Sequence, residues 1–176
     1  MQQAIALILV LICAPFMVLV MLFILLIDWQ NPTFIQERIG INKEPFNIYK
    51  FRTMKNNRVT FLGKLLRRSG LDELPQLFNI ALGDMKFVGP RPLTEFDITR
   101  LGWDGESHSV RWSVTPGITG PAQLINVCDS ERSFACDVYY TENKSVGLDF
   151  QIFFRSLLVP ILGKSKAKHL IGNSGL

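Results

Sequence analysis

The first 27 residues of this 176-residue chain carry no charged side chain, and no Lys or Arg occurs before Arg38. Cysteine is also scarce: Cys13, Cys128 and Cys136 make an odd count, and their spacing matches no zinc-binding pattern. We therefore expect buried or incidental thiols in a reducing compartment. The sequence has no internal repeat and no recognisable nucleic-acid-binding module, so we expect no nucleic acid partner.

An unbroken apolar run of 24 residues, Ala4 to Ile27, fills most of the uncharged region. As an α-helix it would be about 36 Å long, which is enough for the roughly 30 Å hydrocarbon core of a bilayer. A cleaved secretory signal fits poorly, because no Lys or Arg precedes the run and no small-x-small site follows it. We interpret residues 1–28 as a permanent membrane segment with a kink at Pro15, where a helical hydrogen bond is lost.

Two topologies fit this segment, which can span the membrane or can enter and return with both ends in the cytoplasm. Flanking charge does not decide between them, because the N-terminal side has no Lys or Arg for the positive-inside rule to use. Its length allows spanning. The central position of Pro15 favours return, because a break there would turn the helix back within one leaflet.

The net charge of +4 belongs entirely to the rest of the chain, where eight of the 19 Lys and Arg lie between residues 43 and 68. Such a basic region suits the anionic cytoplasmic leaflet or a phosphorylated substrate, although solvated surface lysines are common. Within it, Phe61 to Arg68 has an amphipathic helical pattern that fits a membrane surface and packing on a core equally well. A basic tail, residues 163–176, is expected to be flexible.

Short β-strands are predicted at Phe34–Ile39 and Phe46–Phe51, because turn-forming residues separate two short apolar runs. Apolar residues recur at helical spacing from Phe150 to Ile161 and predict a helix broken by Pro160, packed on the core or lying at the membrane interface. These patterns predict an α+β fold that is mostly helical, with a short β-hairpin in a single domain over residues 29–162.

Two adjacent carboxylates, Asp72 and Glu73, lie just before Pro75. Because proline is tolerated in the first turn of a helix, we expect a helix to begin here with both carboxylates at its N-terminal end. Exposed N–H groups and the helix dipole make such an end an anion site, but acidic residues are also common there simply because they complement the dipole. The expected apolar face of this helix comprises Leu71, Leu74, Leu77 and Phe78.

Further motifs follow or precede the acidic pair in a fixed order along the chain. After the membrane segment with its proline come Lys50-Phe-Arg-Thr-Met54, Ser69 to Asn79, Gly89-Pro-Arg-Pro92, Arg111, Pro116-Gly-Ile-Thr-Gly120 with Gln123, Asp137-Val-Tyr-Tyr140 and Asp149. Taken together, they resemble the monotopic phosphoglycosyl transferases, the bacterial sugar transferase family, which initiate bacterial glycan assembly. The resemblance covers residues 4 to about 162.

The resemblance implies transfer of a phosphosugar from a UDP-sugar to polyprenol (undecaprenyl) phosphate, with release of UMP. The product is a polyprenol diphosphate-linked sugar, formed in two steps through a covalent phosphosugar-aspartate intermediate with magnesium as cofactor. It also implies a small catalytic domain docked on the cytoplasmic face of the bacterial inner (plasma) membrane by amphipathic interfacial helices. Membrane lipid and downstream glycosyltransferases are its candidate partners.

Matching positions one by one, the resemblance makes Asp72 the nucleophile and Glu73 its magnesium-associated partner. An ionised Asp needs no general base, since its free pKa is about 3.9. Asp149 matches an acidic residue near the metal and phosphate, so the metal site is expected at Asp72, Glu73 and Asp149. The expected substrate-binding residues are Lys50, Arg52, Arg91, Arg111 and Arg132.

Several positions depart from the family pattern. Ala14 stands where a serine commonly precedes the membrane proline, and Pro121 stands where an aromatic residue is usual. The stretch Ile125–Cys128 lacks an arginine that contacts phosphate in the family, and Arg132 is the candidate replacement.

Following the family, we predict a re-entrant helix broken at Pro15. The alternative to an enzyme is a catalytically impaired membrane-bound homologue that binds lipid-linked intermediates or partner glycosyltransferases.

Overall fold

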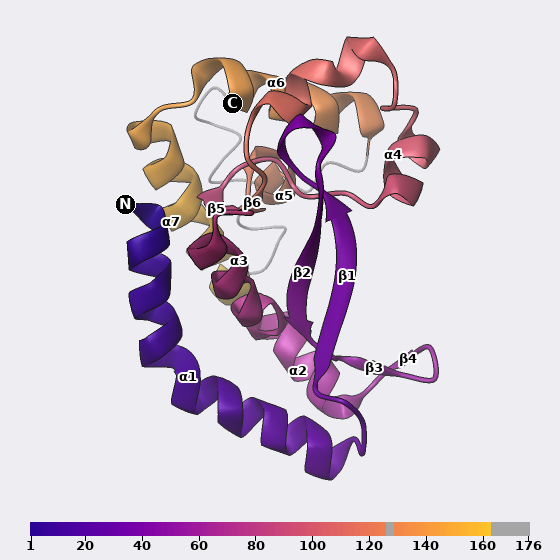
Figure 1. Cartoon of the computed structure of the whole chain (residues 1–176), viewed down its shortest axis with the longest axis vertical. Helices are drawn as coiled ribbons and strands as arrows, with labels where there is room; N and C mark the ends of the chain where they lie inside the picture. The colour runs from indigo at the N-terminus through magenta and orange to yellow at the C-terminus, as the bar shows by residue number, and fades with distance from the viewer. Residues whose placement is uncertain (126–128, 163–176) are drawn as a thin grey trace. The chain divides into compact units, whose positions relative to one another are not determined.

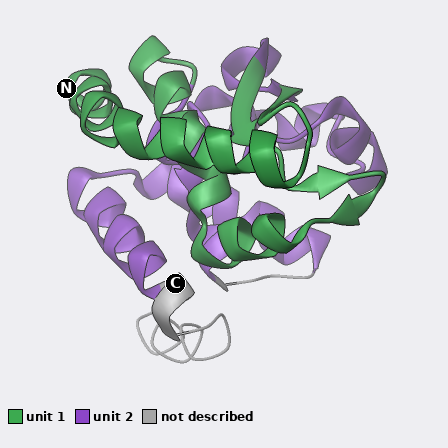
Figure 2. Cartoon of the chain, turned by 90° about the horizontal axis from the view of Figure 1, so that it is seen from below, with its two compact units in different colours: residues 1–37, 47–84 green, residues 38–46, 85–176 purple. Residues whose placement is uncertain are grey.

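A computed structural model describes residues 1–125 and 129–162 and shows a mostly helical chain with a few short strands (Figure 1). This confirms the predicted α+β class in its coarse form. The tail 163–176 and part of the Ile125–Cys128 stretch lie outside the described residues. The chain forms two compact units, coloured separately in Figure 2. The first comprises Met1–Glu37 and Asn47–Asp84, and the second comprises Arg38–Phe46 and the described residues from Met85 onward.

Helix α1 (Gln2–Ile27) in the first unit is built from the apolar run. Figure 1 shows that it bends about half way along, although helical structure continues through Pro15. The expected break is therefore a bend, which proline produces by removing one hydrogen bond and crowding the preceding turn. Re-entry itself stays a prediction. One face of α1 is buried, where helical spacing aligns Ala6, Val10, Met17, Val20 and Ile24.

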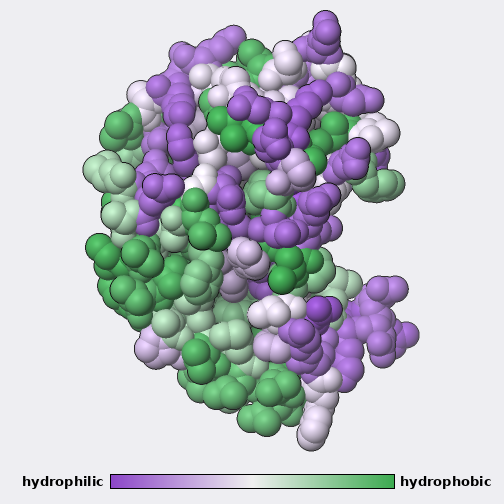
Figure 3. Space-filling model, viewed as in Figure 1, coloured by the Kyte–Doolittle hydropathy of each residue, from purple (hydrophilic) through white to green (hydrophobic). Residues whose placement is uncertain are grey.

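Most other side chains of α1 are exposed and apolar, and Figure 3 shows them gathered along this helix. Within the described residues, α1 is the one helix long and apolar enough to cross a membrane. Exposed apolar area on this scale is unusual for a protein in water, so it indicates membrane association. The other elements of the first unit also expose large apolar side chains, among them Phe61, Leu65, Phe78 and Leu82.

The predicted hairpin is confirmed as β1 (Thr33–Ile39) and β2 (Pro45–Phe51), joined through a short 3-10 turn, η1 (Ile41–Lys43). A second hairpin was not predicted: β3 (Met54–Lys55) pairs with β4 (Arg58–Val59) in antiparallel register. Both residues of its turn, Asn56 and Asn57, have positive φ angles. Asparagine tolerates this conformation better than most residues, which explains a two-residue turn here.

Helix α2 (Phe61–Ser69) confirms the predicted amphipathic helix. The Thr60 side chain caps it by accepting a hydrogen bond from the Gly63 amide at 3.0 Å. The same hydroxyl donates to the Asp28 carboxylate at 2.7 Å, which joins the end of α1 to the beginning of α2. Gly70, with φ 74°, ends the helix and redirects the chain into the acidic segment.

In the second unit, β5 (Lys86–Val88) pairs in parallel with β6 (Gly117–Thr119). Gly117 is required for this pairing, because a Cβ there would lie 2.1 Å from the Gly89 amide nitrogen. Val88 belongs to a core cluster with Leu124, Tyr140 and Ile152. The helical elements around this pair are α4 (Glu95–Leu101), η3 (Glu106–Ser113), α5 (Pro121–Ile125), α6 (Ser130–Asn143) and α7 (Val146–Leu162).

Helix α7 continues through Pro160 to Leu162, so the expected break at that proline is wrong. Its apolar residues are divided between two faces. Ile152 is fully buried in the core cluster, and Phe153 packs against that cluster. Phe150, Phe154, Leu157 and Leu158 are exposed, so the helix combines core packing with an apolar outer face.

Candidate active site

The acidic pair lies on η2 (Leu71–Gln76), a 3-10 helix, and α3 (Leu77–Leu82) follows directly. The predicted helix therefore begins here, but as 3-10 turns. Pro75 has no N–H and would crowd the carbonyl of the preceding turn in an α-helix, so the tighter geometry continues until Leu77. On the expected apolar face, Leu77 is buried, whereas Phe78 is exposed.

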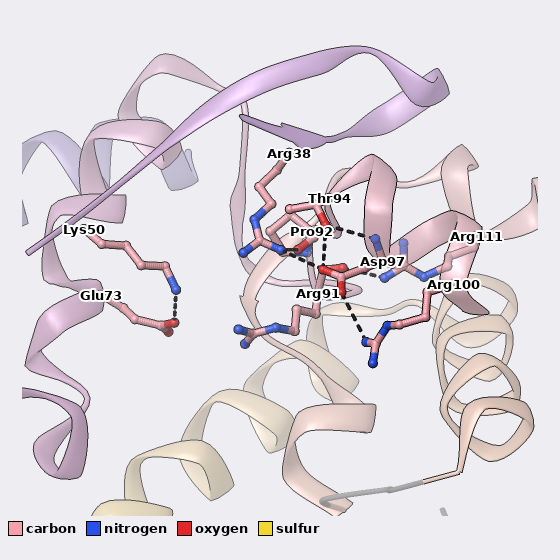
Figure 4. A network of polar contacts seen from close by, with 9 residues as sticks. All are labelled: Arg38, Lys50, Glu73, Arg91, Pro92, Thr94, Asp97, Arg100 and Arg111. Atoms are coloured by element: carbon pink, nitrogen blue, oxygen red, sulfur yellow. Dashed lines mark hydrogen bonds and ion pairs between the residues drawn. The ribbon is translucent and has the colours of Figure 1, made fainter. Parts of the chain in front are cut away.

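Lys50 on β2 pairs with the second carboxylate of the pair. Its Nζ donates to Oε1 of Glu73 at 2.6 Å, and both side chains are largely shielded from water (Figure 4). A charge-assisted bond of this length fixes the orientation of Glu73. The structure thus brings together three of the residues expected to act, Lys50, Asp72 and Glu73, within the first unit.

Asn79 fixes the strand that carries Lys50 against the helix that follows the acidic pair. Its side chain is fully buried, accepts a hydrogen bond from the Tyr49 amide at 3.1 Å and donates to the Asn47 carbonyl at 2.7 Å. Sequence reasoning missed this residue. The signal in the sequence was an amide side chain inside the otherwise apolar segment from Leu77 to Ile80. A polar group buried there would need hydrogen-bond partners.

The environment raises the pKa of Asp72 above its ordinary value, chiefly through burial and then through the adjacent negative charge of Glu73. The positive charges of Lys50 and Arg67 act in the opposite direction. Arg67 is itself held in place, because its Nε donates to Oγ1 of Thr53 at 2.8 Å. A carboxylate with a raised pKa is more basic than a free aspartate, and this kind of perturbation is typical of functional groups.

Replacing Lys50 with methionine is expected to move the acidic limb of the pH–rate profile of the expected phosphosugar transfer to higher pH. Lys50 lowers the pKa of Asp72, so its loss raises that pKa further, and the ionised form is lost earlier as pH falls. We also expect kcat/KM at neutral pH to fall roughly tenfold or more, as for a lost charge-assisted hydrogen bond. The pH dependence of kcat/KM measures both. The control Lys64→Met, at an exposed position of α2, should leave the pH of the acidic limb unchanged. An unchanged acidic limb in Lys50→Met would contradict the claim that Lys50 lowers the pKa of Asp72.

Arg52, an expected substrate-binding residue, has partners within the protein. Its Nε donates to the Asn31 carbonyl at 2.9 Å and its NH2 to the Thr33 carbonyl at 3.0 Å. These bonds hold the beginning of β1. A substrate contact by Arg52 stays a prediction.

In the second unit, the loop around Arg91 is held by its carbonyl groups. The Pro90 carbonyl accepts from the Gly117 amide at 3.0 Å, and the Leu93 carbonyl accepts from the Ile39 amide at 2.8 Å. Between them, the carbonyls of Arg91 and Pro92 accept from the guanidinium groups of Arg111 and Arg38, respectively.

The Arg91 side chain itself is exposed and makes no hydrogen bond to the parts of the chain that the structure describes (Figure 4). A rigid loop therefore presents an unpaired guanidinium, a group suited to bidentate phosphate binding. This geometry supports the expectation for Arg91. Sequence reasoning missed Arg38, whose role depends on a contact between the hairpin tip and a distant loop.

Arg111 is only 2% exposed and is surrounded by protein groups. Its Nε donates to Oδ2 of Asp137 at 2.8 Å, and its guanidinium lies over the rings of Trp103 and Trp112 at 5.4 Å and 4.7 Å. With its other bond to the Arg91 carbonyl, this side chain positions the Arg91 loop. A direct phosphate contact by Arg111 stays a prediction.

Arg132 lies in the first turn of α6 with 83% of its side chain exposed, 3.9 Å from the Asp129 carboxylate. Its role as the replacement arginine stays a prediction. Asp149, in the first turn of α7, accepts a hydrogen bond from the Tyr140 hydroxyl at 2.6 Å. Burial and Asp149 raise the pKa of Tyr140, so the hydroxyl remains a donor.

A metal site is not evident from a ready-made cluster, since no three His, Cys, Asp or Glu side chains gather within residues 1–125 and 129–162. Magnesium is nevertheless compatible with the acidic pair. It is often held by one or two carboxylates together with substrate phosphates and waters, and Asp72 and Glu73 supply such oxygens.

The bacterial sugar transferase family matches residues 1–163 of this chain. A protein named uncharacterized sugar transferase EpsL, from Bacillus subtilis (strain 168), is 36% identical over 162 residues, covering 84% of this chain and 79% of EpsL.

Two further relatives have names that state a reaction. The UDP-N-acetylgalactosamine-undecaprenyl-phosphate N-acetylgalactosaminephosphotransferase of Aeromonas hydrophila is 34% identical over 160 residues, 78% of this chain. The undecaprenyl-phosphate glucose phosphotransferase of Komagataeibacter xylinus is 36% identical over 185 residues, 89% of this chain. The matches span only 38% and 34% of these two longer proteins.

Proposed function

The chain belongs to the bacterial sugar transferase family, and we propose that it is a phosphoglycosyl transferase acting on a UDP-sugar and polyprenol phosphate. Two relatives are named for undecaprenyl-phosphate phosphotransferase reactions, which supports this reaction class. Their sugars differ, so the names do not identify the sugar used here. The observation that carries the proposal is the acidic pair, with Glu73 bound by Lys50 and the partly buried Asp72 beside it.

The reaction proceeds in two displacements at the phosphorus that bears the sugar. A carboxylate oxygen of Asp72 attacks this phosphorus, and the bond to the bridging oxygen breaks so that UMP leaves with the electron pair. An oxygen of polyprenol phosphate then attacks the same phosphorus and displaces Asp72, giving the polyprenol diphosphate sugar. Both nucleophiles are anions, so neither step needs a general base. Dividing the transfer this way lets one soluble and one membrane-bound substrate react in turn.

The remaining side chains offset the repulsion between a carboxylate and a pyrophosphate. Lys50 and Arg67 supply positive charge near Asp72, and Arg91 remains a proposed contact for a phosphate oxygen of the substrate. Magnesium, with Asp72, Glu73 and Asp149 as the ligands that the family resemblance implies, would neutralise phosphate charge. Arg132 and Arg52 remain proposed substrate contacts.

Release of UMP by the purified protein tests this proposal. The assay combines a panel of UDP-sugars with magnesium and polyprenol phosphate, and a chelator arm tests the metal. We expect UMP with at least one sugar, dependent on magnesium. No UMP across the panel would favour the alternative, a homologue that binds lipid-linked intermediates or partner glycosyltransferases.

The site needs a cytosolic UDP-sugar and a lipid phosphate at one membrane face, so we place it on the cytoplasmic face of the inner membrane. The bend of α1 supports re-entry, with Met1 also in the cytoplasm. In a cysteine-free background, Gln2→Cys should then resist a membrane-impermeant thiol reagent in intact cells and react after lysis. Glu95→Cys, on exposed α4, is the control for a cytoplasmic position. Labelling of Gln2→Cys but not of Glu95→Cys in intact cells would show that the segment spans.

A further inference from the structure

The loop that carries Arg91 has a backbone that cannot join a β-sheet in the usual way. Pro90 and Pro92 have no N–H group, so neither can donate to a neighbouring strand. A buried carbonyl still requires a donor, and two arginine side chains supply donors here. Arg111 donates to the Arg91 carbonyl, and Nη1 of Arg38 donates to the carbonyl of the buried Pro92 at 3.3 Å (Figure 4). The position of Arg91 therefore depends on side chains from other elements.

Arg38 is itself fixed by a carboxylate. Its Nη1 lies 3.5 Å from Oδ2 of Asp97, and only 12% of the Arg38 side chain and 27% of the Asp97 side chain are exposed. Such partial burial makes an ion pair less sensitive to screening by salt than a fully exposed one. Because the same nitrogen faces both the Pro92 carbonyl and the Asp97 carboxylate, the guanidinium is held between the Arg91 loop and α4.

Asp97 in turn is held by the beginning of α4. Thr94 caps this helix by accepting a hydrogen bond from the Asp97 amide at 3.0 Å, and its hydroxyl donates to Oδ2 of Asp97 at 2.7 Å. Arg100 lies 3.2 Å from the other carboxylate oxygen, with 63% of its side chain exposed. Arg38 and Arg100 thus share one carboxylate, but Arg38 also binds the Arg91 loop, whereas Arg100 is largely in solvent.

We propose that Arg38, fixed by Asp97, is a positioning residue that holds Arg91 in place for a phosphate of the UDP-sugar. The inference rests on the proposed function, in which Arg91 contacts a substrate phosphate. A guanidinium binds phosphate through two parallel hydrogen bonds, so the strength of the contact depends on direction as well as charge. Loss of the bond to the Pro92 carbonyl lets the Arg91 backbone shift, which weakens the contact without removing any group that touches the substrate.

The test measures KM and kcat of the full-length enzyme for Arg38→Met, Arg91→Met and the double variant. Arg91→Met should raise the KM for the UDP-sugar roughly tenfold, the effect of a lost charge-assisted hydrogen bond. Arg38→Met should raise the same KM about three- to tenfold, and should change kcat and the KM for polyprenol phosphate less than about twofold. The double variant should be little worse than Arg91→Met alone, since Arg38 acts through Arg91.

Arg100→Met is the matched control, because it removes the other cation from Asp97 without affecting a loop carbonyl. It should leave both KM values unchanged. Arg38→Lys has an aliphatic chain similar in length to that of Arg38→Met, so a lower KM in the lysine variant reports the hydrogen bond and not packing. If Arg38→Met does not fold, Arg38→Lys and Asp97→Asn decide, and each should raise the KM for the UDP-sugar by a smaller factor.

An unchanged KM for the UDP-sugar in Arg38→Met or in Arg91→Met would overturn the proposal and leave the proposed function intact. Independent, multiplicative effects of the two substitutions would also overturn it, as would a rise in the KM for polyprenol phosphate alone. If the wild type has no turnover, the proposed function fails, and the Kd for UDP measured by calorimetry decides the positioning role. Weaker UDP binding by both single variants supports that role, whereas unchanged binding, or no binding by the wild type, overturns it.

Discussion

Asp72→Asn is expected to abolish phosphosugar transfer while leaving the fold at least as stable as the wild type. An amide is not a nucleophile toward phosphorus, so the loss should be on the order of 10⁴-fold or more. Folding raises the pKa of Asp72, which means that the folded protein disfavours the ionised form relative to the unfolded chain. At neutral pH the neutral amide removes this penalty, so stability should rise or stay unchanged.

Two measurements made on the same preparation check this expectation: UMP release and thermal unfolding. Asp104→Asn removes an exposed carboxylate elsewhere and should leave UMP release unchanged, which controls for a general effect of lost charge. Turnover by Asp72→Asn near the wild-type rate would exclude Asp72 as the nucleophile. Loss of turnover with a large fall in unfolding temperature would instead indicate a structural role.

Asp137→Asn should have the largest effect on stability, about 3–5 kcal/mol, because it leaves the Arg111 cation buried without a counter-charge. For a chain of this size, that corresponds to a fall in Tm of about 6–20 °C. Oδ1 of Asp137 has no hydrogen-bond partner among the described residues, so an asparagine can place its amide nitrogen there without a direct clash. The expected effect therefore reports the lost charge.

The matched control is Asp129→Asn, which breaks the exposed pair with Arg132. Exposed ion pairs contribute at most about 1 kcal/mol, so its Tm should be close to that of the wild type. Because Arg111 also holds the Arg91 carbonyl, we expect surviving Asp137→Asn protein to show a raised KM for UDP-sugar. Equal unfolding temperatures for both variants would contradict the structural importance of the buried pair.

Local signals in the sequence predicted much of the fold. The uncharged apolar run predicted α1, the turn residues after Ile39 predicted the first hairpin, and the basic amphipathic pattern predicted α2. The 3-10 form of the acidic segment was not predicted, because proline restricts an α-helix without identifying the alternative. The parallel pairing of β5 with β6 joins residues far apart in the sequence, which local periodicity does not report.

The residues of the candidate site were likewise predicted from local motifs, whereas their contacts were not. The pattern of motifs pointed to Asp72 and Glu73, but the partner of Glu73 depends on how β2 lies against η2, which the buried Asn79 determines. Arg111 could be recognised as part of a motif, yet its burial depends on Trp103 and Asp137, which no sequence spacing places around it.

The covalent intermediate is the central claim, and intact mass spectrometry tests it most directly. The purified wild-type protein is incubated with its UDP-sugar and magnesium, without polyprenol phosphate. We predict a mass increase of one sugar phosphate, absent in Asp72→Asn and lost when polyprenol phosphate is added. An unmodified wild-type mass under conditions in which the complete reaction releases UMP would contradict the two-step mechanism and favour direct transfer between the two substrates.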